Sequence, residues 1–184
     1  SPCEFDIWMR ALVKVEGSVL WLSMSNIWSE DNLRMQAEAR GVNPSRLVFA
    51  ARVPMDEHLA RQKLADLFLD TFNYNAHTTA SEALWAGLPI VTKIGGGFAA
   101  RVAASLLTAV GLSELITKSE QEYESLIIDL ANDAEHLEQI QQTLMDNRLT
   151  KPLFDSVLYT KHLENGYQQA YQRYFNGQPP DDIF

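Results

Sequence analysis

The sequence has a single cysteine, Cys3, among its 184 residues. One cysteine excludes an internal disulfide framework and a metal site built from several thiolates. Because disulfides mark oxidising compartments and no signal peptide is recognisable, we expect a cytoplasmic protein. No apolar run approaches the roughly 20 residues that a transmembrane helix needs, so we expect no membrane partner.

Positive charge is also scarce, with 15 Lys and Arg residues against 24 Asp and Glu residues and a formal net charge of −9 at pH 7. This balance argues against nonspecific binding to nucleic acid. The deficit is uneven, because residues 1–110 hold 10 basic and 11 acidic groups, whereas residues 111–184 hold 5 and 13. The first part is therefore the better place for an anionic ligand.

Several arrangements that carry metal, redox or nucleophilic chemistry are missing. The isolated His136 and His162 have no metal-ligand spacing, and we interpret them as structural or solvated. No Asp-x-Asp pair and no nucleophilic triad stands out, and Asp181-Asp182 is interpreted as a solvated tail. No G-x-G-x-x-G motif follows the first apolar run, which argues against a generic dinucleotide-dependent dehydrogenase. We expect no metal and no cofactor.

What is present is an alternation of short apolar runs and amphipathic segments. Nearly all-apolar strands alternating with helices predict an α/β fold with a Rossmann-like, doubly wound parallel sheet covered on both faces. The predicted strands are Val19–Met24, Arg46–Ala50, Leu67–Asp70 and Pro89–Thr92, and the predicted helices are Phe5–Val13, Ser29–Arg40, Glu57–Ala65, Thr78–Ala86 and Phe98–Val110.

The pattern changes at Ser119, where Ser-x-x-Glu is typical of a helix capping box. A helical stripe of apolar residues then runs from Tyr123 to about Asn147, and a second stripe follows from Tyr159 to Tyr174. We predict a core over residues 1–118 and C-terminal helices over residues 119–184, packed on the same domain.

Ligands of an open parallel sheet bind beyond the carboxyl ends of its strands, near helix N-termini. In the segment after the third strand, His77 can donate to a diphosphate oxygen, and Thr78 and Thr79 add hydroxyl donors at a helix start. Glu82, one turn along, can accept from ribose hydroxyls. The alternative is a plain threonine N-cap with Glu82 favoured in the first turn.

Two further loops are weaker candidates. After the second strand, His58 near a helix start can stack on a base, although an ordinary acidic first turn with an exposed His58 is the alternative. After the fourth strand, Gly95-Gly96-Gly97 permits close approach of the backbone to a sugar or phosphate, with Arg101 following. A flexible loop without ligand and a surface Arg101 are the alternatives there.

Taken together, these loops resemble one family. The combination of HTT at residues 77–79, WAGLPIVT at 85–92 and RVAASLL at 101–107 is similar to the C-terminal catalytic lobe of O-linked N-acetylglucosamine transferases and the related SPINDLY proteins, bacterial-type members included. The resemblance continues into KPLFDSVLYTKHLENGYQQAYQRYF and so covers nearly the whole chain. It implies the C-terminal half of a GT-B fold, with residues 1–118 as the nucleotide-sugar binding core.

The resemblance also implies roles for individual residues. His77, Thr78 and Thr79 would hold the diphosphate of UDP-N-acetylglucosamine, and Glu82 would take the place of an acidic ribose ligand. His58 would stack against uracil, the backbone around Val53 would read the base edge, and Arg61 would lie near the nucleotide. Transfer of N-acetylglucosamine to protein Ser/Thr hydroxyls would be metal-independent.

The chain departs from the family pattern in ways that bear on activity. Met55 stands where the family usually has a lysine that touches the nucleotide, and Glu82 stands where aspartate is usual. The family's phosphate-binding lysine, its N-terminal lobe and its tetratricopeptide repeats, which present protein acceptors, lie outside this sequence. We therefore expect weak nucleotide binding, no transfer by this chain alone, and an acceptor base outside it.

Where the C-terminal helices would meet the missing lobe, we expect an exposed apolar patch. Two other functions stay open. One is a SPINDLY-type fucosyltransferase lobe that uses a GDP-sugar. The other is a noncatalytic nucleotide-binding or interaction domain, and Met55 is the residue that favours it.

Overall fold

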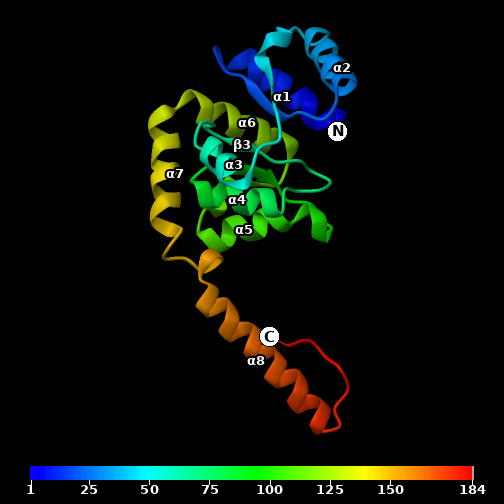
Figure 1. Cartoon of the computed structure of the whole chain (residues 1–184), viewed down its shortest axis with the longest axis vertical. Helices are drawn as coiled ribbons and strands as arrows, with labels where there is room; N and C mark the ends of the chain where they lie inside the picture. Colours follow the sequence, from blue (N-terminus) through cyan, green and yellow to red (C-terminus); the bar gives the residue numbers. More distant parts are fainter. Residues whose placement is uncertain (184) are drawn as a thin grey trace.

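The computed structural model describes residues 1–183, which form an α/β body and one projecting helix (Figure 1). The strands are β1 (Leu20–Ser23), β2 (Leu47–Ala50), β3 (Phe68–Leu69), β4 (Ile90–Lys93) and β5 (Ile116–Thr117). The helices are α1 (Pro2–Lys14), α2 (Ile27–Glu38), α3 (Met55–Gln62), α4 (Thr78–Ala86), α5 (Val102–Val110), α6 (Glu120–Asn132), α7 (Ala134–Asn147) and α8 (Ser156–Phe175). In this part of the chain no helix is long and apolar enough to cross a bilayer.

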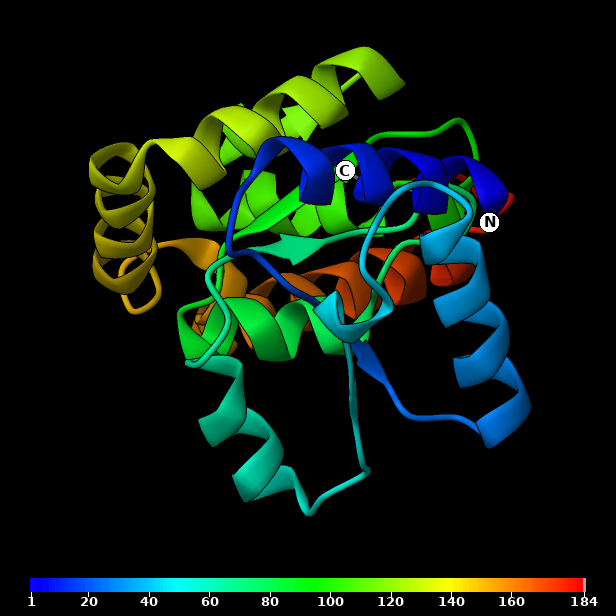
Figure 2. The same ribbon diagram turned by 90° about the horizontal axis from the view of Figure 1, so that it is seen from above.

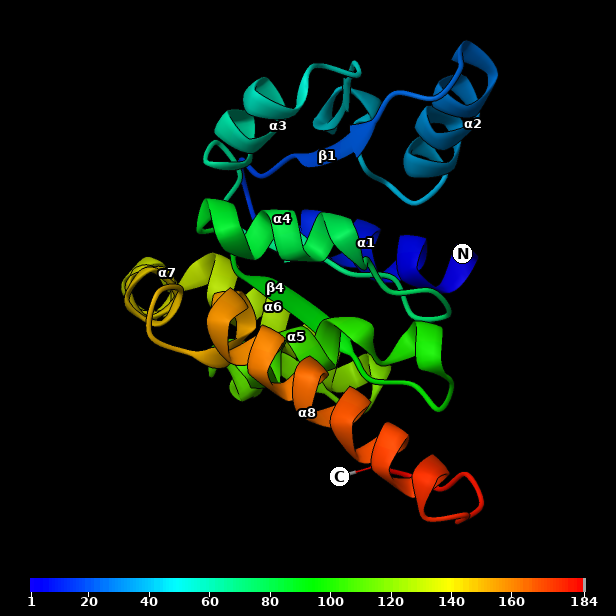
Figure 3. The ribbon, with the colours of Figure 1, turned by 60° about the horizontal axis from the view of Figure 1, so that its bottom comes forward.

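Every strand pair is parallel, and β4 lies between β3 and β5. Figure 3 shows α4 on one side of β4 and α5 and α6 on the other, so helices cover both faces. The predicted α/β class and the Rossmann-like alternation of strands and helices are confirmed.

The strands nevertheless form two sheets, β1–β2 and β3–β4–β5, instead of the single sheet that the sequence predicts. β1 pairs only with β2, and within residues 1–183 no hydrogen-bonded pairing connects these strands to β3, β4 or β5. β3 is two residues long, which leaves little backbone for a second partner. Side chains make the connection instead, because Leu69 of β3 packs against both hydrophobic clusters of the body.

Two features of the second half differ from the prediction. The two-residue strand β5 was not predicted, because Ile116–Thr117 is too short to show a pattern. The single stripe from Tyr123 to Asn147 is divided into α6 and α7 at Asp133, whose side chain accepts from the His136 N–H at 3.0 Å and caps α7. Half of the predicted capping box forms, since Ser119 accepts from the Glu122 N–H, while Glu122 accepts from the Lys118 N–H.

The larger hydrophobic cluster surrounds β4 and is built from α4, α5, α6 and α7. Tyr123 on α6 is its largest fully buried side chain. Its hydroxyl donates to the Asp70 carbonyl at 2.8 Å and accepts from Trp8 Nε1 at 3.3 Å, which connects α6, the end of β3 and α1. Figure 2 shows α1 running alongside α6, in agreement with this contact.

Helix α8 contributes no buried residue. It leaves the body after Phe154 and extends away from it (Figure 1). Its exposed apolar and aromatic side chains form the α8 patch, which consists of Val157, Tyr159, Leu163, Tyr167, Tyr171, Tyr174 and Phe175. An exposed apolar surface was predicted for the C-terminal helices, and α8 carries it.

Replacing Tyr123 with phenylalanine should lower the free energy of unfolding by about 1–2 kcal/mol, because the buried Asp70 carbonyl and Trp8 N–H each lose a partner. Urea unfolding followed by circular dichroism measures the change. The matched control is Tyr159→Phe on exposed α8, which should stay within about 0.5 kcal/mol of the unaltered chain. Equal losses in the two variants would contradict this role for the Tyr123 hydroxyl.

Candidate functional site

The segment between β3 and α4 is organised by the buried carboxylate of Asp70. Asp70 follows β3 directly and is 1% exposed. Its Oδ1 accepts from the Ala76 N–H at 2.7 Å, and its Oδ2 accepts from the Thr92 hydroxyl at 2.6 Å. The first bond fixes the end of the loop just before α4, and the second fixes the loop to β4. One side chain therefore sets where α4 begins relative to the strands.

Burial raises the pKa of Asp70, because removal from water penalises its charged form. The hydrogen bonds from Thr92 and from the backbone of Ala76 and Thr71 act in the opposite direction but do not compensate. The folded chain thus holds this proton more tightly than an exposed aspartate would.

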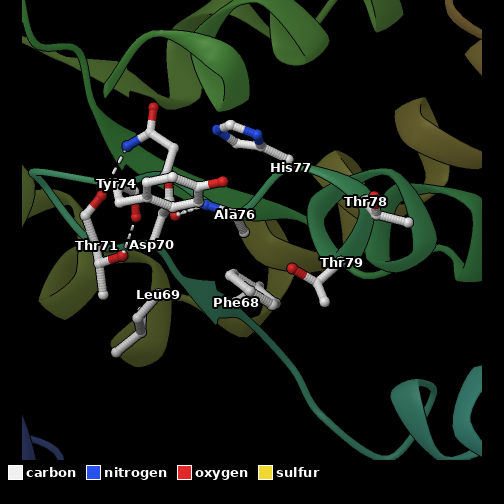
Figure 4. Close-up of a pocket in the computed structure, with 10 residues that line it drawn as sticks. Phe68, Leu69, Asp70, Thr71, Tyr74, Ala76, His77, Thr78 and Thr79 are labelled. Carbon is white, nitrogen blue, oxygen red and sulfur yellow. Dashed lines mark hydrogen bonds between the residues drawn. The ribbon is translucent and has the colours of Figure 1, made fainter. Parts of the chain in front are cut away.

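An open pocket of about 420 Å³ lies beside this loop and the first turn of α4. Figure 4 shows His77, Thr78 and Thr79 along one side and Tyr74 beside His77. The ten lining residues are Phe68, Leu69, Asp70, Thr71, Tyr74, Asn75, Ala76, His77, Thr78 and Thr79. The structure therefore brings the three predicted diphosphate ligands into one pocket.

The N-terminus of α4 has no side-chain cap. His77 occupies the N-cap position without a capping hydrogen bond, and the exposed Thr78 and Thr79 are the first two helical residues. The expected alternative of a threonine N-cap is therefore not what forms. Uncapped N–H groups and the positive end of the helix dipole suit an anionic group.

The second predicted loop meets α4 at Glu82. His58 Nε2 lies 3.5 Å from Glu82 Oε2, and both side chains are largely buried, at 25% and 17% exposed. The Arg61 guanidinium lies 3.0 Å from His58 Nδ1, and the Gln62 side-chain amide nitrogen lies 3.1 Å from His58 Nε2. His58 is thus not the solvent-exposed side chain of the alternative interpretation, and its stacking on a base remains a prediction.

Arg61 is itself held in place, since its Nη1 donates to the Ala51 carbonyl at 2.7 Å and its guanidinium lies over the Trp21 ring at 5.7 Å. Val53 lies in the same β2–α3 connection and is partly buried. Of the predicted residues of this loop, His58 is the one that the structure places against Glu82, and Arg61 contacts His58.

The glycine segment after β4 approaches the pocket from another side. A Cβ on Gly95 would lie 2.6 Å from Ala100 Cβ, so glycine is required at that position, whereas Gly96 and Gly97 border open space. Arg101 is exposed and occupies the N-cap of α5. The segment reaches the site through Ala99, whose carbonyl accepts from the Asn75 N–H at 2.8 Å.

Three residues of the site were not singled out by sequence reasoning: Asp70, Tyr74 and Asn75. The position of an acidic residue at the end of an apolar strand could have indicated Asp70 as a residue of the site. Nothing in the sequence marked Tyr74, whose ring stacks on His77 at 4.6 Å between centroids. Within residues 1–183 no group of three or more His, Cys, Asp or Glu side chains is arranged to hold a metal ion.

The raised pKa of Asp70 predicts a stability change with pH. A carboxyl group whose pKa is raised on folding stabilises the folded state most at low pH, and this contribution is lost as pH rises from the ordinary value of 3.8 through the folded-state value. Stability of the unaltered chain relative to Asp70→Asn should therefore fall as pH rises over that range, in urea titrations at several pH values. A difference that stays constant or grows would contradict the raised pKa.

Comparison with known proteins agrees with this architecture. The sequence profile described as glycosyl transferase family 41 matches residues 1–163. A UDP-N-acetylglucosamine--peptide N-acetylglucosaminyltransferase of Caenorhabditis elegans is 38% identical over 183 residues, which are 100% of this chain and 16% of that protein. The probable enzyme of the same description from Arabidopsis thaliana, SEC, is also 38% identical, over 98% of this chain and 18% of its own length.

More distant relatives carry the same description with the name SPINDLY, and the one from Hordeum vulgare is 34% identical over 98% of this chain and 20% of its own length. The chain therefore spans about a fifth or less of these relatives.

Among solved structures, a mutant of the O-GlcNAc transferase of Thermobaculum terrenum superposes with a TM-score of 0.85 and 30% identity, covering 90% of this chain and 32% of that one. The profile match, the relatives and the superposition agree, and the chain belongs to glycosyl transferase family 41.

Proposed function

We propose that this chain is the donor-binding lobe of a protein O-glycosyltransferase that transfers N-acetylglucosamine from UDP-N-acetylglucosamine to Ser/Thr hydroxyls. The observation that carries the proposal is the uncapped start of α4 at His77-Thr78-Thr79, on the wall of a pocket at the carboxyl end of β3. Membership of family 41 and the descriptions of the relatives as UDP-N-acetylglucosamine--peptide N-acetylglucosaminyltransferases support this donor.

In this proposal the diphosphate binds at the first turn of α4, where His77 and the hydroxyls of Thr78 and Thr79 donate to it. Glu82 lies four residues after Thr78, on the same face of α4 and about 6 Å along its axis. A nucleoside attached to that diphosphate then extends toward Glu82 and His58, which the structure holds together.

The remaining predicted ligands surround this path. Glu82 accepts from the ribose, the His58 ring contacts the base, and the backbone near Val53 reads the base edge. Arg61 acts through His58, because its guanidinium is occupied by His58 and the Ala51 carbonyl. The loop of Gly95, Gly96 and Gly97, together with Arg101, contacts the sugar or a phosphate of the donor.

Transfer itself needs more than these residues supply. In the proposal no metal takes part, so the leaving diphosphate is stabilised by the α4 dipole and its donors. The acceptor base and the protein-acceptor surface come from sequence outside this chain, which spans only 16–20% of its curated relatives. The α8 patch contacts that other part of the protein. The protein acts in the cytoplasm.

Two alternatives are separated by nucleotide choice. A SPINDLY-type lobe that prefers a GDP-sugar is the second enzyme function, and relatives with that name are slightly less similar, at 34% or below against 38%. A noncatalytic domain is the other alternative, and Met55, which is exposed at the start of α3, favours it because methionine makes no charged contact with a nucleotide.

The first test is calorimetric titration of this chain with UDP, UDP-N-acetylglucosamine, GDP and GDP-fucose at low salt. We expect weak binding selective for uridine, and His77→Ala should weaken it about tenfold, since a charge-assisted hydrogen bond contributes about 1.5–3 kcal/mol. The control is His136→Ala, at an exposed residue of α7 far along the chain from the pocket, which should leave the affinity unchanged.

The outcomes separate the functions. Selectivity for guanosine nucleotides would support the fucosyltransferase lobe. Uridine binding that His77→Ala leaves intact would contradict the placement of the diphosphate at α4. If none of the four ligands binds, the same titration is repeated on a longer form that includes the N-terminal lobe. Binding by the longer form would mean that the site is incomplete in this chain, and no binding would mean that the site has lost its function.

Met55 gives a second prediction. Met55→Lys should increase the affinity for UDP about three- to tenfold at low salt, because it places a cation at the start of α3, near His58, for an anionic ligand. Leu149→Lys, on an exposed residue after α7, adds the same charge elsewhere and controls for net charge. Equal gains from both variants would mean that the effect is general attraction and not a local contact.

A further inference from the structure

Two aromatic rings contact the His77 imidazole. The Tyr74 ring stacks on the imidazole with centroids 4.6 Å apart and an interplanar angle of 15°. The Phe98 ring meets the imidazole edge-on, at 5.9 Å and 85°. Tyr74 comes from the loop after β3 and Phe98 from the loop after β4, so two separate segments enclose one side chain.

Polar contacts alone do not fix the imidazole. Within residues 1–183 its one polar contact is from Nε2 to the Ala99 carbonyl, and at 3.4 Å this contact is long. A histidine at an N-cap with so weak a polar anchor is free to rotate unless its ring is packed. The packing at His77 is supplied by Tyr74 and Phe98.

We propose that Tyr74, with Phe98, is a positioning residue that holds the His77 imidazole in the orientation needed to donate to a phosphate group. The proposal rests on the proposed function, in which His77 contacts the diphosphate. The Tyr74 stack covers one face of the imidazole, and the ring edge that carries the two nitrogens stays uncovered by Tyr74.

The backbone that carries Tyr74 is firmly held although its ring is 65% exposed. The Thr71 hydroxyl donates to the Tyr74 carbonyl at 2.5 Å. The next residue, Asn75, is fully buried, and its side-chain amide donates to the Thr71 carbonyl at 2.7 Å while its N–H donates to the Ala99 carbonyl. A rigid turn thus presents an exposed ring to His77.

Exposure of Tyr74 also separates positioning from stability. The ring belongs to neither hydrophobic cluster, so removing it should leave the folded core intact. If the ring had no role beyond folding, its loss would change neither the His77 environment nor ligand affinity. A large exposed aromatic side chain in contact with one functional residue is instead explained by its effect on that residue.

The test compares Tyr74→Leu, which removes the ring, with Tyr74→Phe, which keeps it. The matched control is Tyr171→Leu, because Tyr171 is also 65% exposed and contacts an aromatic ring, Phe175, edge-on with centroids 4.6 Å apart, but lies on α8. Proton NMR of the His77 imidazole reports the stack directly, since a ring lying face-on shifts the imidazole proton resonances upfield. Calorimetry with UDP reports the functional consequence.

We expect Tyr74→Leu to abolish the upfield shift of His77 and to weaken UDP binding about three- to tenfold, the range that corresponds to one aromatic pair. Tyr74→Phe should preserve the shift and bind within about twofold of the unaltered chain, by the same reasoning. Tyr171→Leu should change neither readout.

An unchanged His77 resonance in Tyr74→Leu overturns the proposal, and so does a shifted resonance with unchanged UDP affinity. Failure of the proposed function looks different, because the unaltered chain would then not bind UDP while the His77 resonance would still respond to Tyr74→Leu.

Discussion

The carboxylate of Asp70 is the interaction on which the site depends. It connects the end of β3 to β4 through Thr92 and to the start of α4 through Ala76, and the carbonyl of the same residue accepts from Tyr123 on α6. These contacts come from three directions and meet in a region closed to water. Removing this carboxylate would leave the Ala76 N–H and the Thr92 hydroxyl without partners. The position of the loop that carries His77 therefore depends on Asp70.

Much of the fold could be predicted from the sequence because its signals are local. Helix α4 has the predicted bounds, since Gly87, at φ +93°, provides the left-handed C-cap that the sequence suggested. The division into two sheets could not be predicted, because it depends on how little backbone β3 leaves for pairing. The break at Asp133 was missed because apolar residues on α6 and α7 keep helical spacing across it.

The site was predictable where residue type alone carries the chemistry, as at His77 and the two threonines after it. Its supporting contacts depend on distances between loops far apart in sequence, and no pattern in one segment indicates them. The His58–Glu82 pair joins segments 24 residues apart, and the Tyr74–His77 stack depends on a turn set by Thr71. Sequence therefore indicates which groups can bind a ligand, and the fold determines which way they point.

The lack of buried residues on α8 has a thermodynamic consequence. This 20-residue helix belongs to neither hydrophobic cluster and so lacks the tertiary packing from which helices in proteins draw most of their stability. Its helix–coil equilibrium is therefore uncoupled from the cooperative unfolding of the body. The slope of the unfolding free energy against denaturant concentration then reflects only the surface that the body exposes on unfolding. If a partner covered the α8 patch, the melting of α8 and the unfolding of the body would become one cooperative transition.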